Sequence, residues 1–165
     1  MRVLGVDPGT ISCGYGIVDD RTGDQKAVTY GAIKCKQSAP MGERLLLIYN
    51  TLDELITEHK PDAMAVESPF VGQNAKTGIA FGKAQAVVLL LAAKHKIECI
   101  EYPPRIIKRV VSNYGGADKT QMQRMVKMLL NLDKIPEPND AADALAIAMT
   151  HFQETQISRL NDRIR

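Results

Sequence analysis

The chain has 165 residues, of which 45% are hydrophobic and 24% are charged, a composition that indicates a globular protein with a sizeable buried core. This length predicts a single domain over residues 1–165. The N-terminus lacks a signal-peptide pattern, and the longest apolar run, 86–93, is shorter than the roughly 20 residues that a membrane span needs. The cysteines and histidines lack zinc-ligand spacing, so we expect a cytoplasmic protein with reduced thiols and no membrane contact.

The net charge of +2 conceals an uneven distribution of charge along the chain. Residues 71–134 contain 11 Lys or Arg and only 4 Asp or Glu, whereas the remainder contains 10 basic and 15 acidic residues. A basic block of this kind suits a polyanion such as nucleic acid. A solvated helical surface without a partner is the alternative that charge alone leaves open.

The first predicted strand ends in a carboxylate. Val3, Leu4 and Val6 favour a strand that is buried on both faces, and the Pro-Gly pair that follows Asp7 ends it. The carboxyl ends of strands are where sites form in open α/β sheets. Asp before Pro-Gly is also common turn chemistry, so Asp7 alone does not distinguish a site from a turn.

The next segments predict a second strand over 12–18, a polar turn over 19–24 and a third strand over 26–34, in an antiparallel meander. Gly14 and Gly16 in the second strand indicate a close backbone approach or a bulge. An amphipathic helix begins at Pro40, with Ser38 as a candidate cap, and ends near residue 60. The fourth strand, 63–66, places Glu67 at its carboxyl end, which repeats the situation of Asp7. If these two strands are parallel neighbours, both carboxylates emerge at the same edge of the sheet.

The second half of the chain predicts one long helix followed by three shorter helices. The long helix covers 75–94, where Gly78 and Gly82 create a smooth face for a dimer contact or for tight packing on the sheet. A strand over 97–101 follows it. The later helices are expected at 104–113, at 119–130 with Asp118 as cap and a methionine stripe in the core, and at 140–153 with Asn139 as cap. A short basic tail over about 154–165 completes the chain.

The last helix carries two acids on one face. Asp140 and Asp143 are three residues apart in the first turn, where the helix dipole favours negative charge. Dipole stabilisation explains Asp140 well but Asp143 less well, because apolar residues follow it directly. Gathered with Asp7 and Glu67, these acids would repel one another unless they held hard divalent cations. Two such ions, about 3.5–4 Å apart, can serve both the attacking and the leaving oxygens of a phosphodiester displacement.

Three stretches resemble, in the same order, the RuvC family of bacterial Holliday-junction resolvases: Val-Asp-Pro-Gly-Thr at 6–10, Ala-Val-Glu-Ser-Pro-Phe at 65–70 and Asp-Ala-Ala-Asp-Ala-Leu-Ala-Ile-Ala at 140–148. The resemblance implies a ribonuclease H-like α/β fold with a five-stranded mixed sheet flanked by helices. It also implies a structure-selective endonuclease of DNA recombination and repair. Such an enzyme resolves four-way junctions by metal-dependent hydrolysis, in paired symmetric nicks that leave 5′ phosphates and 3′ hydroxyls.

The resemblance also assigns roles to single residues. The metal-binding catalytic acids match Asp7, Glu67, Asp140 and Asp143. Lys108 and Lys119 match basic residues near the DNA, and Lys119 is expected to assist catalysis. Phe70 matches an aromatic residue that engages the junction, although a core phenylalanine is the alternative. Charge alone makes four further residues candidates for backbone contacts, or else inert surface charges: Lys76, Lys83, Arg105 and Arg109.

The family further implies that each subunit binds two Mg²⁺, for which Mn²⁺ can substitute. It also implies a homodimer and a branch-migration motor as partner. Two other functions stay open. An actin-like or sugar-kinase-like ATPase fragment would explain the Gly-Val-Asp-Pro-Gly-Thr stretch, but those proteins need two such domains around a nucleotide. A catalytically silent junction-binding protein would explain the basic block, but it would not gather carboxylates beside DNA.

Overall fold

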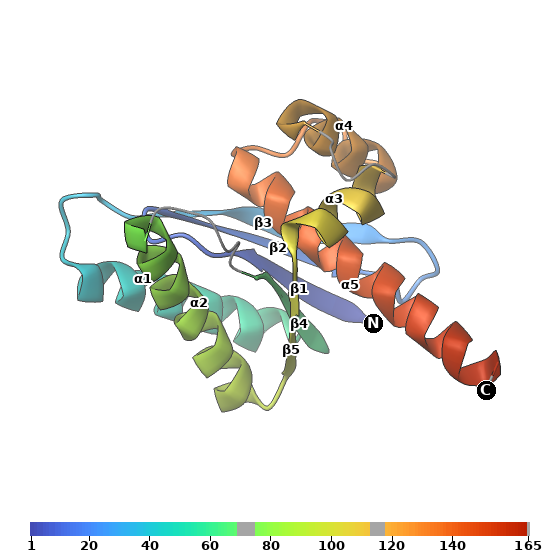
Figure 1. Ribbon diagram of the computed structural model, residues 1–165, viewed down its shortest axis with the longest axis horizontal. Coiled ribbons are helices and arrows are strands. Elements are labelled where there is room, and N and C mark those ends of the chain that lie inside the picture. The colour runs from blue at the N-terminus through green and yellow to red at the C-terminus, as the bar shows by residue number, and fades with distance from the viewer. Residues whose placement is uncertain (69–74, 113–117, 165) are drawn as a thin grey trace.

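Five strands form one mixed sheet in the order β3-β2-β1-β4-β5 in the computed structural model, which describes residues 1–68, 75–112 and 118–164 (Figure 1). Strands β1, β2 and β3 are antiparallel neighbours, whereas β1, β4 and β5 run parallel. The predicted antiparallel meander, the parallel pairing of the first and fourth strands and the five-stranded mixed sheet are confirmed. The strands are β1 Arg2–Asp7, β2 Ser12–Asp19, β3 Lys26–Lys34, β4 Ala63–Glu67 and β5 Glu98–Tyr102.

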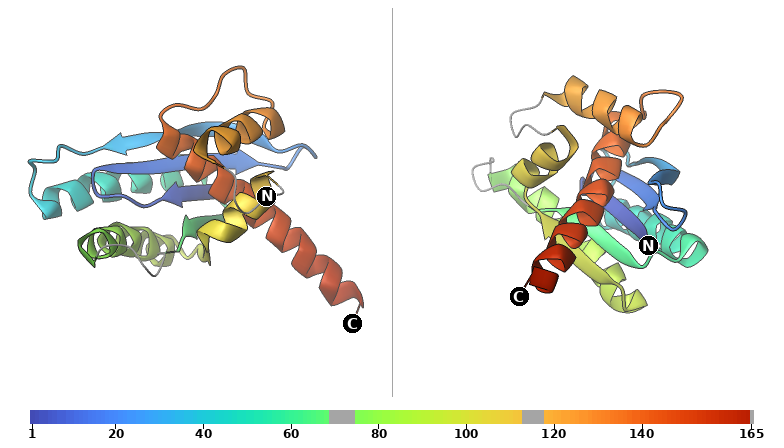
Figure 2. Two further views of the ribbon diagram at one scale, coloured as in Figure 1. Left: turned by 45° about the horizontal axis from the view of Figure 1, so that its top comes forward. Right: turned by 90° about the vertical axis from the view of Figure 1, so that its right-hand side faces the viewer.

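Helices cover both faces of the sheet (Figures 1 and 2). The pair α1 and α2 packs on one face over Leu4, Val6 and Met64. The other three helices pack on the opposite face, with α5 across the strands and α3 and α4 against α5. The sheet is therefore the middle layer of three. The helices are α1 Met41–His59, α2 Ala75–His95, α3 Pro104–Ser112, α4 Lys119–Leu129 and α5 Asn139–Ile164.

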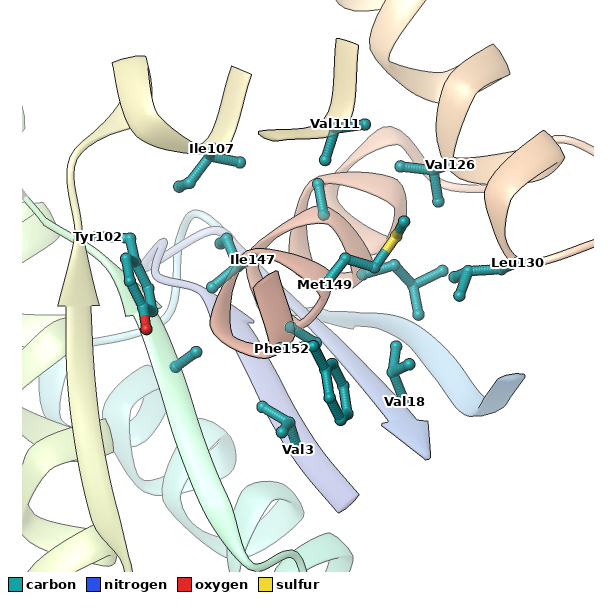
Figure 3. Close-up of a cluster of buried hydrophobic side chains, with 14 of the residues drawn as sticks. Val3, Val18, Tyr102, Ile107, Val111, Val126, Leu130, Ile147, Met149 and Phe152 are labelled. Carbon is teal, nitrogen blue, oxygen red and sulfur yellow. The ribbon is translucent and has the colours of Figure 1, made fainter. Parts of the chain in front are cut away.

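The core on the α5 face explains why the last helix is so apolar in its first half. Figure 3 shows Ile147, Met149 and Phe152 of α5 among side chains of β1, β2, α3 and α4. Met122 and Val126 of α4 are buried in this cluster and Met125 packs against it, which confirms most of the predicted methionine stripe as core, whereas Leu129 at the end of that stripe is 45% exposed. Burial of such side chains stabilises the fold by roughly 1.5–3 kcal/mol each.

Helix α5 lies directly on glycines of the neighbouring strands β1 and β2. A Cβ atom added to Gly5 would lie 2.1 Å from the backbone oxygen of Ala144, and one added to Gly14 would lie 2.0 Å from the backbone oxygen of Asp140. At Gly16 the added atom would meet the Leu145 side chain at 2.9 Å. The predicted close backbone approach at Gly14 and Gly16 is therefore confirmed. It places the first turn of α5 at the carboxyl end of β1.

Several predicted boundaries are wrong. Pro40 rather than Ser38 is the N-cap residue of α1, and it makes no side-chain cap bond. Asn139 is the first residue of α5 rather than its cap. Strand β5 begins one residue later than predicted, at Glu98.

The predicted basic tail is part of a helix. Helix α5 continues to Ile164, because residues 139–164 contain neither Gly nor Pro to end it. Figure 2 shows its C-terminal half projecting away from the sheet.

Helix α2 presents an open face instead of packing its glycines on the sheet. A Cβ atom added to Gly78 or Gly82 would meet no atom of the described residues within 4 Å, so the predicted sheet packing at these glycines is wrong. By length and composition alone α2 could span a membrane, with a mean hydropathy of 1.3. Val88 and Leu91 are buried against α1 and the sheet, and 33% of the apolar window is buried in the fold.

We predict that Gly14→Ala lowers the free energy of unfolding by roughly 1–3 kcal/mol, because the new methyl group must push α5 off the sheet. Urea unfolding followed by circular dichroism measures this change. Gly42→Ala is the matched control, since in the described part of the chain a Cβ atom added at that position, in the first turn of α1, would meet nothing within 4 Å. Equal stability of Gly14→Ala and wild type would contradict the close approach.

Candidate active site

Two carboxylates lie at the carboxyl ends of neighbouring parallel strands. The parallel pairing of β1 with β4 sets Val6 beside Val66, so Asp7 and Glu67 end their strands at the same edge, as predicted. Both line a cavity of about 210 Å³. The rest of its wall comes from α3, α4 and α5, and includes Asp143, Lys108 and Lys119 together with Pro104, Ile107, Met122, Ala146 and Ile147.

Helix α5 adds the two remaining acids. Carboxylate oxygens of Asp7, Asp140 and Asp143 lie within 4.8 Å of one another, which is a geometry that can hold a metal ion. Glu67 is outside this three-residue group but shares the cavity with Asp7 and Asp143. The structure thus brings together all four acids that the sequence singled out.

The electrostatics of the four acids favour a bound cation. Burial, reinforced by the charges of Glu67, Asp143 and Asp140, raises the pKa of Asp7 from its ordinary 3.8 to about 7. Burial and the charge of Asp143 likewise raise the pKa of Glu67 to about 7. The pKa of Asp143 is also raised, chiefly by burial. Buried carboxylates that repel one another fit hard divalent cations, which supply the missing positive charge through oxygen ligation.

Two lysines face this cluster from the helices that cover it. The Lys119 Nζ atom lies 3.3 Å from Oδ2 of Asp143. Helix α4 begins at this lysine because Asp118 and Gln121 form a capping box, so the predicted cap is confirmed. Lys108 reaches the same cavity from α3. Both lysines lower the pKa of Glu67 and of Asp143, against the larger effect of burial.

Asp140 has polar neighbours that the sequence analysis missed. Ser12, at the start of β2, donates a hydrogen bond to Oδ2 of Asp140. The Lys34 Nζ atom, at the end of β3, lies 3.1 Å from the same oxygen. Burial opposes ionisation of Asp140, but these hydrogen bonds outweigh it and lower the pKa of this carboxyl. The register that pairs Ser12 with Lys34 was the missing information, since strand prediction alone does not specify it.

The other predicted DNA-binding residues lie away from the cavity, and Phe70 falls outside the described residues. Lys76 and Lys83 of α2 line a separate groove of about 430 Å³ beside Arg44 of α1, a cation that the sequence analysis did not single out. An isolated arginine in an amphipathic helix carries no sequence signal of such a role. On α3, Arg105 is exposed, and Arg109 donates to Glu154 of α5 at 3.3 Å.

The five-stranded sheet and its acidic edge define a ribonuclease H-like nuclease, and known proteins narrow this class. Residues 3–151 match the family described as Crossover junction endodeoxyribonuclease RuvC. The enzyme of that name from Dehalococcoides mccartyi is 45% identical over 163 residues, which cover 99% of both chains. The one from Chloroflexus aurantiacus is 47% identical over 151 residues, or 92% of both chains. The chain belongs to the RuvC family of crossover junction endodeoxyribonucleases, which are phosphodiester hydrolases.

Solved structures agree with this membership. Thermus thermophilus RuvC in complex with a Holliday junction substrate is 30% identical, with a TM-score of 0.90 over 96% of each chain. The yeast mitochondrial Holliday junction resolvase is 14% identical, with a TM-score of 0.64 over 90% of this chain and 76% of its own, and it shares the fold.

We predict that metal-free protein loses stability as pH rises from about 4 to about 7, because folded Asp7 and Glu67 hold protons that the unfolded chain releases near pH 4. Asp7→Asn removes part of this loss. In EDTA at pH 8 the variant should be more stable than wild type by roughly 1–3 kcal/mol, and near pH 4 the two should be equal. Urea unfolding across this pH range measures both.

Asp24→Asn, in the exposed turn between β2 and β3, controls for the loss of one negative charge. An equal gain at pH 8 from this control would mean that net charge, rather than the acidic cluster, is responsible.

Proposed function

We propose that this RuvC-family endonuclease resolves four-way DNA junctions in recombination and repair, by paired symmetric nicks that leave 5′ phosphates and 3′ hydroxyls. The observation that carries the proposal is the cluster of Asp7, Asp140 and Asp143 at one sheet edge. It occurs in a chain that matches the junction-bound Thermus thermophilus enzyme over 96% of its length. Carboxylates gathered beside a cationic wall suit hydrolysis of a phosphodiester better than plain binding of DNA.

The acids are proposed to hold two Mg²⁺ per subunit, with Mn²⁺ as a substitute. An all-carboxylate donor set favours these hard ions over zinc or copper. Divalent ions bound there would supply the Lewis-acid chemistry of an in-line displacement at phosphorus. The proposed ligands are Asp7, Glu67, Asp140 and Asp143.

The two lysines at the cavity are proposed to bind the scissile phosphate. Lys119 begins α4, where the capping box fixes its backbone, and its ammonium group, on a side chain that is 57% exposed, lies 3.3 Å from Oδ2 of Asp143. It can therefore stabilise negative charge that develops in the transition state. Lys108 is proposed to hold a phosphate oxygen from the opposite wall. Ile107 and Met122 add apolar side chains to the wall of the same cavity.

Other basic residues are proposed to bind the DNA backbone away from the cut. Lys76 and Lys83 share a groove with Arg44, and none of the described residues that line it is acidic. Arg105 and Arg109 would extend the basic surface along α3. Phe70 is also proposed to stack on an unpaired base, because it ends the family motif that contains Glu67. Phosphate contacts of this kind make binding fall steeply with salt.

The open face of α2 supports a homodimer. Gly78 and Gly82 leave part of α2 smooth, and on the same helix the side chains of Ile79 and Leu90 are 61% and 60% exposed. Small residues allow a second helix to approach closely, and exposed apolar side chains favour burial in an interface. A junction with two-fold symmetry also calls for two active sites related by a two-fold axis. A second copy of this chain is therefore the proposed occupant of the face.

The family further supports a branch-migration motor as partner and a cytoplasmic location, which suits the free thiols of Cys13, Cys35 and Cys99. We infer one domain over 1–165, because the two core clusters share a single sheet. The match of residues 3–151 to the RuvC family favours the endonuclease over an ATPase of the actin or sugar-kinase type. A silent binder is disfavoured by the buried acids, which would weaken DNA binding without serving it.

We predict that the protein cuts a synthetic four-way junction in Mg²⁺ but leaves a linear duplex of the same sequence intact. Asp7→Asn should reduce the cleavage rate by at least about 100-fold and leave junction affinity within a few fold, because it removes a metal ligand and not the basic surface. Cleavage in Mg²⁺ and in EDTA, with binding measured by fluorescence anisotropy, tests both parts.

Cutting of duplex and junction alike would keep the nuclease and withdraw junction selectivity. Tight junction binding without cutting in any divalent metal would favour the silent binder instead.

We predict that wild-type protein sediments as a dimer and that Leu90→Asp sediments as a monomer with an unchanged fold, since this side chain is already 60% exposed. Analytical ultracentrifugation at micromolar concentration, with circular dichroism, measures both properties. Met128→Asp is the matched control, because that side chain is 64% exposed on α4, across the sheet from α2. A monomeric wild type would refute the dimer.

A further inference from the structure

Three side chains from three elements meet at the outer side of the acidic cluster. Ser12 begins β2 and Lys34 ends β3, and the antiparallel register pairs them directly. The Lys34 Nζ atom lies 2.7 Å from the Ser12 Oγ atom and 3.1 Å from Oδ2 of Asp140. The Ser12 hydroxyl in turn donates to Oδ2 of Asp140. Lysine, serine and carboxylate thus form a closed triangle of hydrogen bonds.

Both donors bind the same carboxylate oxygen. Among the described residues, the hydrogen bonds to the Asp140 side chain from Ser12 and Lys34 end on Oδ2, which leaves Oδ1 for a metal ion. The carboxyl torsion of an aspartate is soft and broadly distributed, so the side chain alone does not select which oxygen faces the ion. Two donors on one oxygen remove this freedom. Partners of this kind typically orient metal ligands and change metal affinity by about 10–100-fold.

We propose that Ser12 and Lys34 are positioning residues that orient Asp140 for metal binding, and that Lys34 acts through this carboxylate rather than on the DNA. The inference rests on the proposed metal-dependent function. Lys34 is 58% exposed beside an open hollow that Lys119 and Asp140 also line, so a DNA phosphate could reach it. Two of the three N–H donors of its ammonium group, however, are already bound to Ser12 and Asp140, so a phosphate could be held only through the third.

The two residues make separable contributions. Ser12 supplies a neutral hydrogen bond, whereas Lys34 also places a positive charge next to a metal ligand, and that charge by itself repels a cation. Positioning therefore predicts weaker metal binding when Lys34 is removed, and a simple counter-ion role predicts tighter binding. The two explanations differ in the sign of a measurable quantity.

The test measures Mn²⁺ binding to DNA-free protein by electron paramagnetic resonance, beside junction affinity in EDTA. Ser12→Ala and Lys34→Met should each weaken Mn²⁺ binding about 10-fold. Junction affinity should stay within twofold, and the Mg²⁺ concentration for half-maximal cleavage at saturating junction should rise by the same factor as the Mn²⁺ dissociation constant. Ser12→Thr keeps the hydroxyl and should restore wild-type Mn²⁺ binding.

Lys26→Met is the matched control, because this lysine lies at the other end of β3, where it pairs with Asp19. Tighter Mn²⁺ binding by Lys34→Met would overturn the inference in favour of a counter-ion. Weaker junction binding with unchanged Mn²⁺ affinity would overturn it in favour of a DNA contact. If the wild-type protein neither binds Mn²⁺ nor cuts junctions, the proposed function itself is overturned. If the wild-type protein binds Mn²⁺ and Ser12→Ala binds it equally well, only this inference is overturned.

Discussion

The direct contact of α5 with the glycines of β1 and β2 is the constraint on which the site depends. Side chains at Gly5 or Gly14 would collide with the backbone of α5, so only glycine allows the helix to lie this low on the sheet. That position brings the first turn of α5, with Asp140 and Asp143, to the strand end that carries Asp7. A helix at the usual distance from the sheet would leave these acids too far apart to share an ion.

The same packing gathers negative charge at a cost in stability. Burial and mutual repulsion raise the pKa of Asp7 and of Glu67 to about 7, so the metal-free fold carries an electrostatic strain around neutral pH. Lysines on the covering helices relieve part of it, and Lys119 contacts Asp143 directly. The large apolar core under α5 tolerates this cost, since Ile147 and Phe152 are almost fully buried nearby. The buried core under α5 thus stabilises the fold, whereas the acids at the edge of the sheet destabilise it.

Prediction succeeded where one local pattern sufficed and failed where partners were distant in sequence. The buried run of β1 and the cap at Asp118 are local signals, and both are confirmed. The spacing of Gly78 and Gly82 predicts either tight packing on the sheet or a dimer contact, and the structure excludes packing on the sheet. The predicted end of α5 near residue 153 is too early, and Ile157, Leu160 and Ile164, which recur at helical spacing, are the signal that could have extended it.

By itself the sequence determined the strand and helix order, the four acids and, through three ordered motifs, the family. These follow from residue type and spacing, which are properties of short stretches. Only the tertiary structure decided which acids share an ion site, that Lys119 faces Asp143, and that Ser12 and Lys34 bind Asp140. Such contacts join residues up to 128 positions apart, and they depend on strand register and on the depth at which α5 packs. Neither quantity is encoded in any single stretch of the chain.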